Sequence, residues 1–258
     1  MIRSLTGASE LLLKWSHNFF ETLKYDPAIR GLFILESNNS RLAIFALENE
    51  LYFPPVNLAN ADGLLAIGGD LSPQRLLLAY RRGIFPWYEG DYILWWSPDP
   101  RFVLFPSELK ISKSMKALLK KNAFDFTINK AFREVIHSCK EIKRPGQKGT
   151  WITDEVEEAY FKMHSLGYAM SAEAWKNGDL VGGVYGIKLG RVFFGESMFS
   201  KMSNASKYAF TRLVDSLQQQ RVAMIDCQVY TEHLESLGAR MITRKEFNRN
   251  LDEMIEER

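Results

Sequence analysis

Three apolar segments joined by two tight turns constrain the fold of this chain more than any other feature. The first turn is Asn177-Gly178-Asp179, and the second is centred on Gly190. Asn-Gly and glycine turns between segments rich in aromatic and β-branched residues are typical of antiparallel hairpins. The sequence therefore predicts a three-stranded antiparallel meander, with strands at residues 168–176, 180–189 and 191–199.

Helices and strands are expected on both sides of this meander. A helix is predicted before it, because Thr153 can cap a helix, acidic residues follow in the first turn, and Gly167 ends the segment. After the meander, apolar residues at helical spacing predict a long helix at 204–220. The elements expected next are a strand at 222–230, a short helix at 232–237 and a strand at 241–243.

The order of these elements is similar to that of the N-acyltransferase fold known best from acetyl-CoA-dependent enzymes. We therefore expect an α+β (mixed α/β) protein, in which a C-terminal GNAT-like catalytic domain spans residues 101–258. Residues 51–100 are predicted to form a smaller N-terminal α+β domain, so the boundary lies near residues 99–101.

The small domain and the residues before it carry less information. Ser72 as a cap, Pro73 in the first turn and Gly83 at the end predict one helix in the small domain. Residues 1–50 are interpreted as an N-terminal extension of unknown function. A helix near residues 9–24 and a strand at 42–47 are expected within it.

Composition excludes several classes of protein. No apolar run reaches the length of a membrane span, and Lys14 interrupts the early leucine run, which leaves no clean signal peptide. Cys139 and Cys227 are far apart and the four histidines lack metal-ligand spacing, so we expect neither a disulfide nor a bound metal. These features predict a cytoplasmic protein without a metal or cofactor. Because the net charge is only +2, a nucleic-acid partner would need a local basic patch.

The junction between the third meander strand and the long helix bears on the acyl donor. CoA-dependent N-acyltransferases hold the CoA pyrophosphate in a glycine-rich turn at this place. Here residues 200–207 read S-K-M-S-N-A-S-K and include no glycine. Since bulky residues keep backbone amides away from a pyrophosphate, the sequence disfavours CoA as the donor.

Polar side chains in two predicted strands are candidates for chemistry. In the strand I-D-C-Q-V, alternation places Asp226 and Gln228 on one face. They could orient an amine and receive its proton, or they could form a satisfied buried network. In the third meander strand, Glu196 lies among aromatic and thioether groups, next to Gly195. The pocket residues and this acid cannot point the same way unless the strand bulges.

A basic stripe follows the predicted domain boundary. Ser112 can cap a helix, and its lysines fall on one side at 3.6 residues per turn. These lysines are Lys113, Lys116, Lys120 and Lys121. The stripe could bind phosphates, or it could be a solvated helix face.

Ten short motifs, in order, resemble the leucyl/phenylalanyl-tRNA–protein transferase family. They cover the chain from about residue 50 to its end and read F-P-P at 53–55, G-L-L-A-I-G-G-D-L-S at 63–72, Y-R-R-G-I-F-P-W-Y at 80–88, W-W-S-P-D-P-R at 95–101, G-T-W-I-T at 149–153, G-G-V-Y-G at 182–186, G-E-S-M-F-S at 195–200, N-A-S-K at 204–207, I-D-C-Q-V at 225–229 and H-L-E-S-L-G-A at 233–239. Departures from the family pattern are Ala117, where a basic residue can stand, and Val184, where some members have Met.

The resemblance implies a reaction and its partners. Leu or Phe, and less well Met, would be moved from aminoacyl-tRNA to the N-terminal amine of proteins beginning with Arg or Lys, which marks them for degradation. It implies that Asp226 and Gln228 are the catalytic pair with Glu196 beside them, and that the lysine stripe binds tRNA. It also implies an aminoacyl-adenosine site formed by Trp87, Trp151, Phe193, Gly195, Met198, Ser200 and Phe210.

Such a reaction needs no cofactor, because an aminoacyl ester is already activated and an α-amine with a pKa of about 8 is partly neutral at physiological pH. Two other interpretations remain open. One is a CoA-dependent N-acetyltransferase of the same fold, and the other is a non-catalytic binder of charged tRNA or of protein N-termini.

Overall fold

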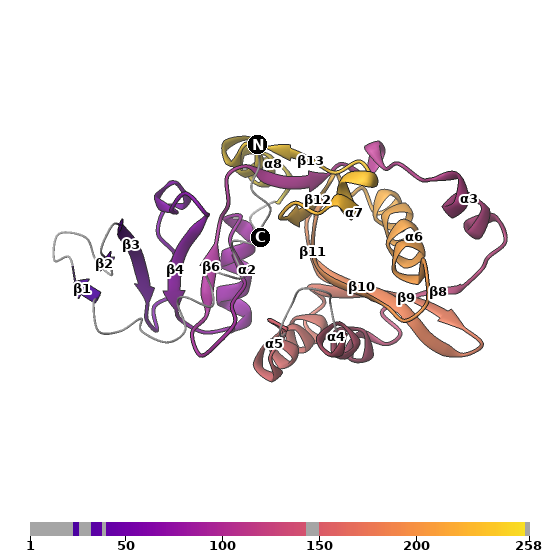
Figure 1. Cartoon of the computed structure of the whole chain (residues 1–258), viewed down its shortest axis with the longest axis horizontal. Helices are drawn as coiled ribbons and strands as arrows, with labels where there is room; N and C mark the ends of the chain where they lie inside the picture. Colours follow the sequence, from indigo (N-terminus) through magenta and orange to yellow (C-terminus); the bar gives the residue numbers. More distant parts are fainter. Residues whose placement is uncertain (1–22, 26–31, 38–39, 143–149, 256–258) are drawn as a thin grey trace. The chain divides into compact units, whose positions relative to one another are not determined.

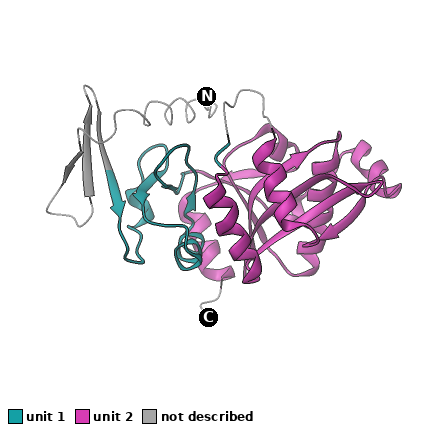
Figure 2. Cartoon of the chain, turned by 90° about the horizontal axis from the view of Figure 1, so that it is seen from below, with its two compact units in different colours: residues 1–99, 143–151 teal, residues 100–142, 152–258 magenta. Residues whose placement is uncertain are grey.

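The computed structural model describes residues 23–25, 32–37, 40–142 and 150–255. The chain divides into two compact units, which are coloured differently in Figure 2. Unit 1 consists of residues 1–99 and 143–151, and unit 2 consists of residues 100–142 and 152–258. Among the described helices, none combines the length and the hydropathy that spanning a membrane requires.

Unit 1 contains a six-stranded sheet with the order β1-β2-β3-β4-β6-β5. Its strands are β1 (Leu23–Tyr25), β2 (Leu32–Ser37), β3 (Ser40–Leu47), β4 (Leu64–Gly68), β5 (Phe85–Pro86) and β6 (Leu94–Trp96). The strand expected at 42–47 is confirmed as β3, which pairs in parallel with β4. The helix expected near 9–24 falls mostly outside the described residues, but it does not reach Lys24, since Leu23 and Lys24 belong to β1.

The helix predicted in the small domain is confirmed as α2 (Pro73–Arg81). The side chain of Ser72 accepts a hydrogen bond from the backbone N–H of Arg75, and Pro73 stands in the first turn. Gly83 follows the helix with φ of 69°, a left-handed conformation that favours glycine. A 3-10 turn, η1 (Val56–Leu58), precedes β4. These local signals were sufficient to predict where α2 begins and ends, because each one acts on its own helix end.

Unit 2 contains a seven-stranded sheet with the order β13-β7-β12-β11-β10-β9-β8. Its strands are β7 (Arg101–Leu104), β8 (Asp125–Ile128), β9 (Ala169–Lys176), β10 (Asp179–Leu189), β11 (Val192–Ser200), β12 (Met224–Gln228) and β13 (Arg240–Ile242). Its helices are η2 (Pro106–Glu108), α3 (Lys113–Lys120), α4 (Phe132–Glu141), α5 (Asp154–Ser165), α6 (Ala205–Gln219), α7 (Glu232–Ser236) and α8 (Arg244–Met254). Helix α6 covers one face of the sheet, and α4 and α5 cover the other (Figure 1).

The predicted mixed α+β class is confirmed, and so are the antiparallel meander β9-β10-β11 and the elements after it. In the sheet of unit 2, the adjacent strands β11 and β12 are parallel. In unit 2, the elements that the sequence did not predict are β7, β8, α4 and the 3-10 turn η2, and in unit 1 only β3 and α2 were predicted. Strands β7 and β8 have only four residues each, too few for a clear alternation, so only their partners in the sheet define them. Helix α4 was missed because its N-cap residue, Ala131, makes no side-chain cap.

The core between α6 and the sheet supports the central strands. Phe210, Leu213, Val214 and Leu217 of α6 are all at most 2% exposed and belong to one apolar cluster. Phe193 of β11 and residues of β7, β9, β10 and β12 complete this cluster. Because interiors are close-packed, the position of β11 relative to β12 is fixed by this layer.

Candidate active site

A β-bulge at Glu196 shapes the middle of β11. Tyr185 pairs with Ser197 and Gly186 pairs with Gly195, so Glu196 is the extra residue on its strand. Without a bulge, Phe193 and Met198 would point to opposite faces. Instead, both contact the apolar cluster under α6. The strand therefore does bulge, but the bulge does not turn the acid to the pocket side: Phe193 and Met198 face α6, whereas Glu196 contacts Tyr160 of α5 on the other face of the sheet.

Gly186 makes this bulge possible on the neighbouring strand. A Cβ atom at position 186 would overlap the carbonyl oxygen of Phe194 and would lie 2.5 Å from Cζ of Phe193. A glycine here thus permits the close approach of β10 to the bulged strand.

The carboxylate of Glu196 bridges two other elements of unit 2. The hydroxyl of Tyr160, on α5, donates to its Oε2 at 3.0 Å. The side-chain amide of Gln228, at the end of β12, donates to its Oε1 at 3.1 Å. Glu196 and Gln228, both predicted from the sequence, are therefore in direct contact, while Tyr160 was not predicted.

The end of β12 is irregular at Gln228. Its φ is 62°, and the pairing of β12 with β7 shifts register between Asp226 and Gln228. The prediction assumed a regular strand with the two side chains in alternation, and that assumption is wrong. The backbone N–H of Gln228 donates to Oδ1 of Asp226 at 2.9 Å, which holds the strand end in this conformation.

Asp226 lies inside the core and is paired with Arg101 of β7. Nε of Arg101 donates to Oδ1 at 2.8 Å, and Nη2 donates to Oδ2 at 2.7 Å. Asp226 is 0% exposed and Arg101 is 1% exposed. Two-point, charge-assisted hydrogen bonds of this kind are about twice as strong as hydrogen bonds between neutral groups. The sequence analysis placed Arg101 at the domain boundary and at the end of a family motif but gave it no role, although an arginine among apolar residues indicates a buried partner.

Cys227, between these two site residues, is not a nucleophile. Burial raises the pKa of its thiol strongly, and the nearby Asp226 carboxylate adds to the effect. The thiol is therefore protonated at neutral pH, and only a thiolate attacks carbonyl groups well.

The predicted aminoacyl-adenosine residues of unit 2 lie along β11 and α6. Phe193 and Phe210 are 0% and 2% exposed, whereas Met198 is partly exposed at the margin of the apolar cluster. Ser200 ends β11, and its Oγ accepts from the N–H of Ser206 and donates to the carbonyl of Met202. The remaining residue is Gly195, directly before the bulge.

The other two predicted residues of this site, Trp87 and Trp151, belong to unit 1. The carbonyl of Trp87 accepts a hydrogen bond from the indole of Trp96, and the two rings are 5.9 Å apart. Trp151 is 9% exposed. Their contribution to a site shared with β11 stays a prediction.

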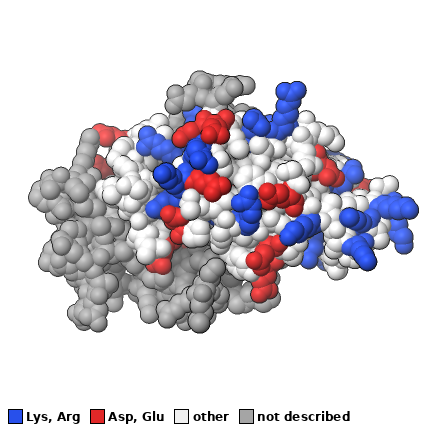
Figure 3. Space-filling model, turned by 90° about the horizontal axis from the view of Figure 1, so that it is seen from above, with Lys and Arg blue, Asp and Glu red and all other residues white. Residues whose placement is uncertain are grey.

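The basic stripe lies on α3 as expected. Ser112 caps this helix by accepting from the N–H of Met115, and Met115 is buried. All four lysines of the stripe, Lys113, Lys116, Lys120 and Lys121, are exposed. Figure 3 shows lysine and arginine side chains gathered at the end of unit 2 that carries α3. A cationic surface of this kind attracts phosphates.

Within the described ranges, no group of three or more His, Cys, Asp or Glu side chains is arranged to hold a metal ion.

Comparisons with known proteins give one consistent result. The family model of leucyl/phenylalanyl-tRNA protein transferase matches residues 103–252, and the model of that family's N-terminal domain matches residues 69–99. A leucyl/phenylalanyl-tRNA–protein transferase of Syntrophobacter fumaroxidans is 56% identical over 217 residues, which cover 84% of this chain and 93% of the relative. One of Flavobacterium johnsoniae is 58% identical over 205 residues, 79% of this chain and 97% of the relative.

One solved structure is similar at a low level. A GCN5-related N-acetyltransferase-like protein of Streptococcus suis is 11% identical, with a TM-score of 0.37 over 92% of this chain and 95% of that chain.

Proposed function

The chain belongs to the leucyl/phenylalanyl-tRNA–protein transferase family and is an aminoacyltransferase, and we propose that it transfers Leu or Phe from aminoacyl-tRNA to the N-terminal amine of proteins that begin with Arg or Lys. The observation that carries this proposal is the contact between Gln228 and Glu196 at the point where β11 and β12 separate. Met would be a weaker donor, and the modified proteins would become substrates for degradation.

We propose a GNAT-like fold for unit 2 from its own topology. The pairing of β11 with β12 ends at Phe194 and Asp226, although β11 continues to Ser200. Two parallel strands that diverge in the middle of a sheet leave room for a substrate between them. Glu196 and Gln228 each lie two residues beyond the last paired residues, so an ester carbonyl between the strands would be within their reach.

The donor pocket would be formed by the apolar side of β11. Phe193 and Met198 lie on the same face because of the bulge, with Phe210 of α6 in the same cluster. Aromatic and thioether groups suit a Leu or Phe side chain and discriminate poorly by a single methylene, which accounts for some use of Met. Trp87 and Trp151 would add stacking surfaces for the terminal adenine.

Gln228 would be the group that contacts the acceptor amine. Its Nε2 donates to Glu196, so its amide oxygen points away from that carboxylate and can accept a hydrogen bond from an amine N–H. Asp226 would act through Gln228, since both of its oxygens already accept from Arg101 and one also accepts from the Gln228 backbone. The catalytic contribution would come from alignment and from stabilising positive charge on the amine.

Glu196 would determine which acceptor proteins bind. Its carboxylate is a counter-charge for an ammonium or guanidinium group close to the reacting amine. Acceptors beginning with Arg or Lys would therefore bind better than those beginning with an uncharged residue.

The lysine stripe on α3 would bind the tRNA body. Lys113, Lys116, Lys120 and Lys121 are exposed and make no recorded ion pair within the described residues. Phosphate contacts of this type are electrostatic and largely independent of sequence. The enzyme would act in the cytoplasm, where charged tRNA is found, and would need neither metal nor cofactor.

One assay tests the proposal. Purified protein is mixed with labelled Phe-tRNA and a peptide beginning with Arg, with and without acetyl-CoA. We expect label on the peptide amine in both mixtures. Label transfer that depends on acetyl-CoA would identify an N-acetyltransferase, and binding without transfer would identify a non-catalytic binder. A peptide beginning with Ala should react much more slowly, and equal rates would contradict the role of Glu196.

A further inference from the structure

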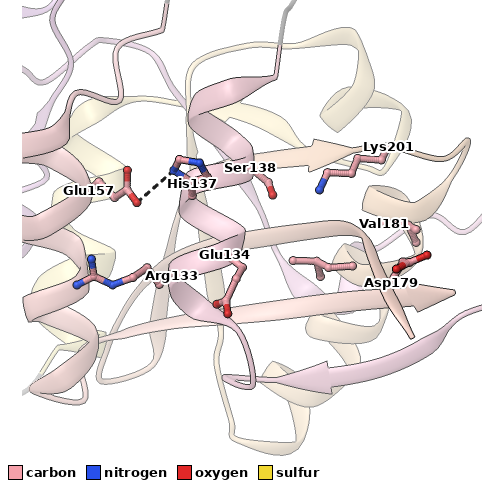
Figure 4. A pocket seen from close by; sticks show the side chains of 9 residues that line it. Arg133, Glu134, His137, Ser138, Glu157, Asp179, Val181 and Lys201 are labelled. Carbon is pink, nitrogen blue, oxygen red and sulfur yellow. Dashed lines mark ion pairs between the residues drawn. The ribbon is translucent and has the colours of Figure 1, made fainter. Parts of the chain in front are cut away.

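An open hollow of about 810 Å³ lies in unit 2 between α4, the start of β10 and the end of β11. Figure 4 shows Arg133, Glu134 and His137 on the α4 side, and Lys201 and Asp179 on the opposite side. The side chain of Lys201 points across the hollow toward α4 (Figure 4). None of these five residues has a place in the chemistry described above.

Some of the charged side chains in the hollow have ion-pair partners and others have none among the described residues. Arg133 is paired with Glu158 at 2.7 Å, and His137 lies 3.5 Å from Glu157. Within the described residues, Glu134 and Asp179 have no recorded hydrogen bond or ion pair. The hollow therefore offers two carboxylates with free acceptor capacity, at a place where cations are also present.

Lys201 supplies an exposed cation whose backbone is fixed and whose ammonium lies near an aromatic ring. Its Nζ lies 5.6 Å from the ring centroid of Phe199, and its backbone N–H donates to the carbonyl of Val181 at 2.7 Å. An ammonium over an aromatic face keeps its remaining hydrogens available for an anion.

The hollow begins where the proposed adenosine site ends. Lys201 directly follows Ser200, and Ser200 pairs with Gly182, the next residue after Val181 in the wall of the hollow. A Cβ atom at Gly182 would lie 2.6 Å from Cβ of Ala205, so the start of α6 packs on the other side of this wall from α4 and the hollow. A nucleotide chain that passes around the end of β11 at Ser200 would reach the hollow on the α4 side.

We propose that the hollow binds the nucleotide that precedes the terminal adenosine of the donor tRNA, a cytidine of the CCA end. The inference rests on the proposed function. Glu134 and Asp179 would accept hydrogen bonds from the exocyclic N4 amine of cytosine, which is the usual contact of carboxylates with this base. Lys201 would neutralise a phosphate of the single strand.

A basic peptide segment is the competing occupant. It would satisfy the two carboxylates, but it would bring positive charge next to Lys201 and Arg133, and like charges at close range repel. A nucleotide combines donors for the carboxylates with an anion for the lysine, so it matches both kinds of group in the hollow.

The test compares three donors that carry the same phenylalanyl ester: adenosine, cytidylyl-adenosine and uridylyl-adenosine. For the unchanged enzyme, we expect a KM about tenfold lower for the cytidylyl donor than for adenosine, and loss of most of this gain with uracil, which has an acceptor in place of the amine. In the double variant Glu134→Gln/Asp179→Asn, the preference for cytosine over uracil should disappear. In Lys201→Ala, both dinucleotides should lose affinity. The KM for phenylalanyl-adenosine should stay the same in both variants.

The control is Glu155→Gln/Lys162→Ala, which changes an exposed carboxylate and an exposed lysine on α5 outside the hollow. It should behave like the unchanged enzyme with all three donors. The adenosine donor also reports correct folding, because a misfolded variant would lose activity with it.

Three results would overturn the inference: no difference between the dinucleotides and adenosine in the unchanged enzyme, variants that keep the cytosine preference, or variants that change only the KM of the acceptor peptide, which would assign the hollow to the peptide. By contrast, if the unchanged enzyme consumed none of the donors, the proposed function itself would fail.

Discussion

The side-chain amide of Gln228 donates a hydrogen bond to the carboxylate of Glu196 across 3.1 Å, although the two residues are 32 positions apart in the chain. One comes from an irregular strand end and the other from a β-bulge. Bulges next to active sites re-aim side chains, and here two distortions bring an amide and an acid together.

We predict that Gln228→Ala lowers kcat by roughly 10²-fold with little change in stability, since loss of one preorganised hydrogen-bonding group in an active site costs about 10²–10³-fold. Gln228 is partly exposed, and removing its side chain leaves the backbone contact to Asp226 in place. Steady-state transfer from Phe-tRNA and a thermal melt measure the two effects. Gln228→Glu places a second carboxylate beside Glu196 and should not restore activity. Full kcat in both variants would exclude contact with the amine.

The buried pair of Arg101 and Asp226 should be essential to stability. Each single change, Arg101→Met or Asp226→Leu, leaves one charge in the core without its partner and should cost about 3–5 kcal/mol. The double variant should be more stable than the sum of the single effects predicts, because it removes both charges together. Urea unfolding of all four proteins completes the cycle, and strictly additive effects would mean that the pair does not interact energetically.

The sequence was sufficient to predict those parts of the fold that depend only on residues close together in the chain. Ser72, Ser112 and Thr153 each cap the helix predicted from them, because a cap acts within one turn. The turn at Asn177-Gly178 likewise defines its hairpin, with both residues at positive φ. Strand pairing of the meander follows from such local signals.

The site could be predicted only in part, because its geometry depends on distant residues. Arg101 reaches Asp226 over 125 positions, and no periodicity in either strand indicates that partner. The hydrogen bond from Tyr160, on α5, to Glu196 could not be predicted either, since a tyrosine at that helical spacing suggests only a core position. Strand alternation had already indicated Asp226, Gln228 and Glu196, and the motif resemblance gave them roles. The long-range contacts define which of them is accessible.

The bulge itself can be tested at Gly186. We expect Gly186→Ala to destabilise the protein by about 1–3 kcal/mol, the usual effect of overpacking. It should also lower kcat, because the new methyl group collides with Phe193 and Phe194 beside Glu196. Gly183→Ala is the matched control, because Gly183 lies on the same strand, β10, but away from the bulge. Its new methyl group would crowd Phe199 of β11 and Val135 of α4. The control should lose stability and keep kcat. Equal kcat values for the two variants would mean that the bulge does not contribute to catalysis.

The α3 stripe should act through charge. Changing Lys113, Lys116, Lys120 and Lys121 to Ala should raise the KM for Phe-tRNA. It should also reduce the slope of log affinity against log salt by roughly 3, since each phosphate contact contributes about 0.7–0.9. The KM for phenylalanyl-adenosine, which lacks the tRNA body, should not change. An unchanged salt slope would identify the stripe as solvated surface.

His233 should make stability depend on pH in a defined direction. Both ring nitrogens are inaccessible and have no hydrogen-bond partner among the described residues. Burial lowers the pKa of this histidine, and the charge of Lys207 lowers it further. Below the unfolded value of about 6.5, the unfolded chain binds a proton that the folded protein disfavours.

The stability that His233 contributes is therefore complete above pH 6.5 and is lost as the pH falls through the lowered folded pKa. His233→Gln removes the titrating group, so the Tm of this variant should fall less between pH 7.5 and pH 5 than that of the unchanged protein. Melts across this range compare the two, and the carboxylates, common to both proteins, cancel in the difference. Parallel curves would mean that His233 takes up its proton without cost in the folded state, which a buried imidazole next to a lysine should not do.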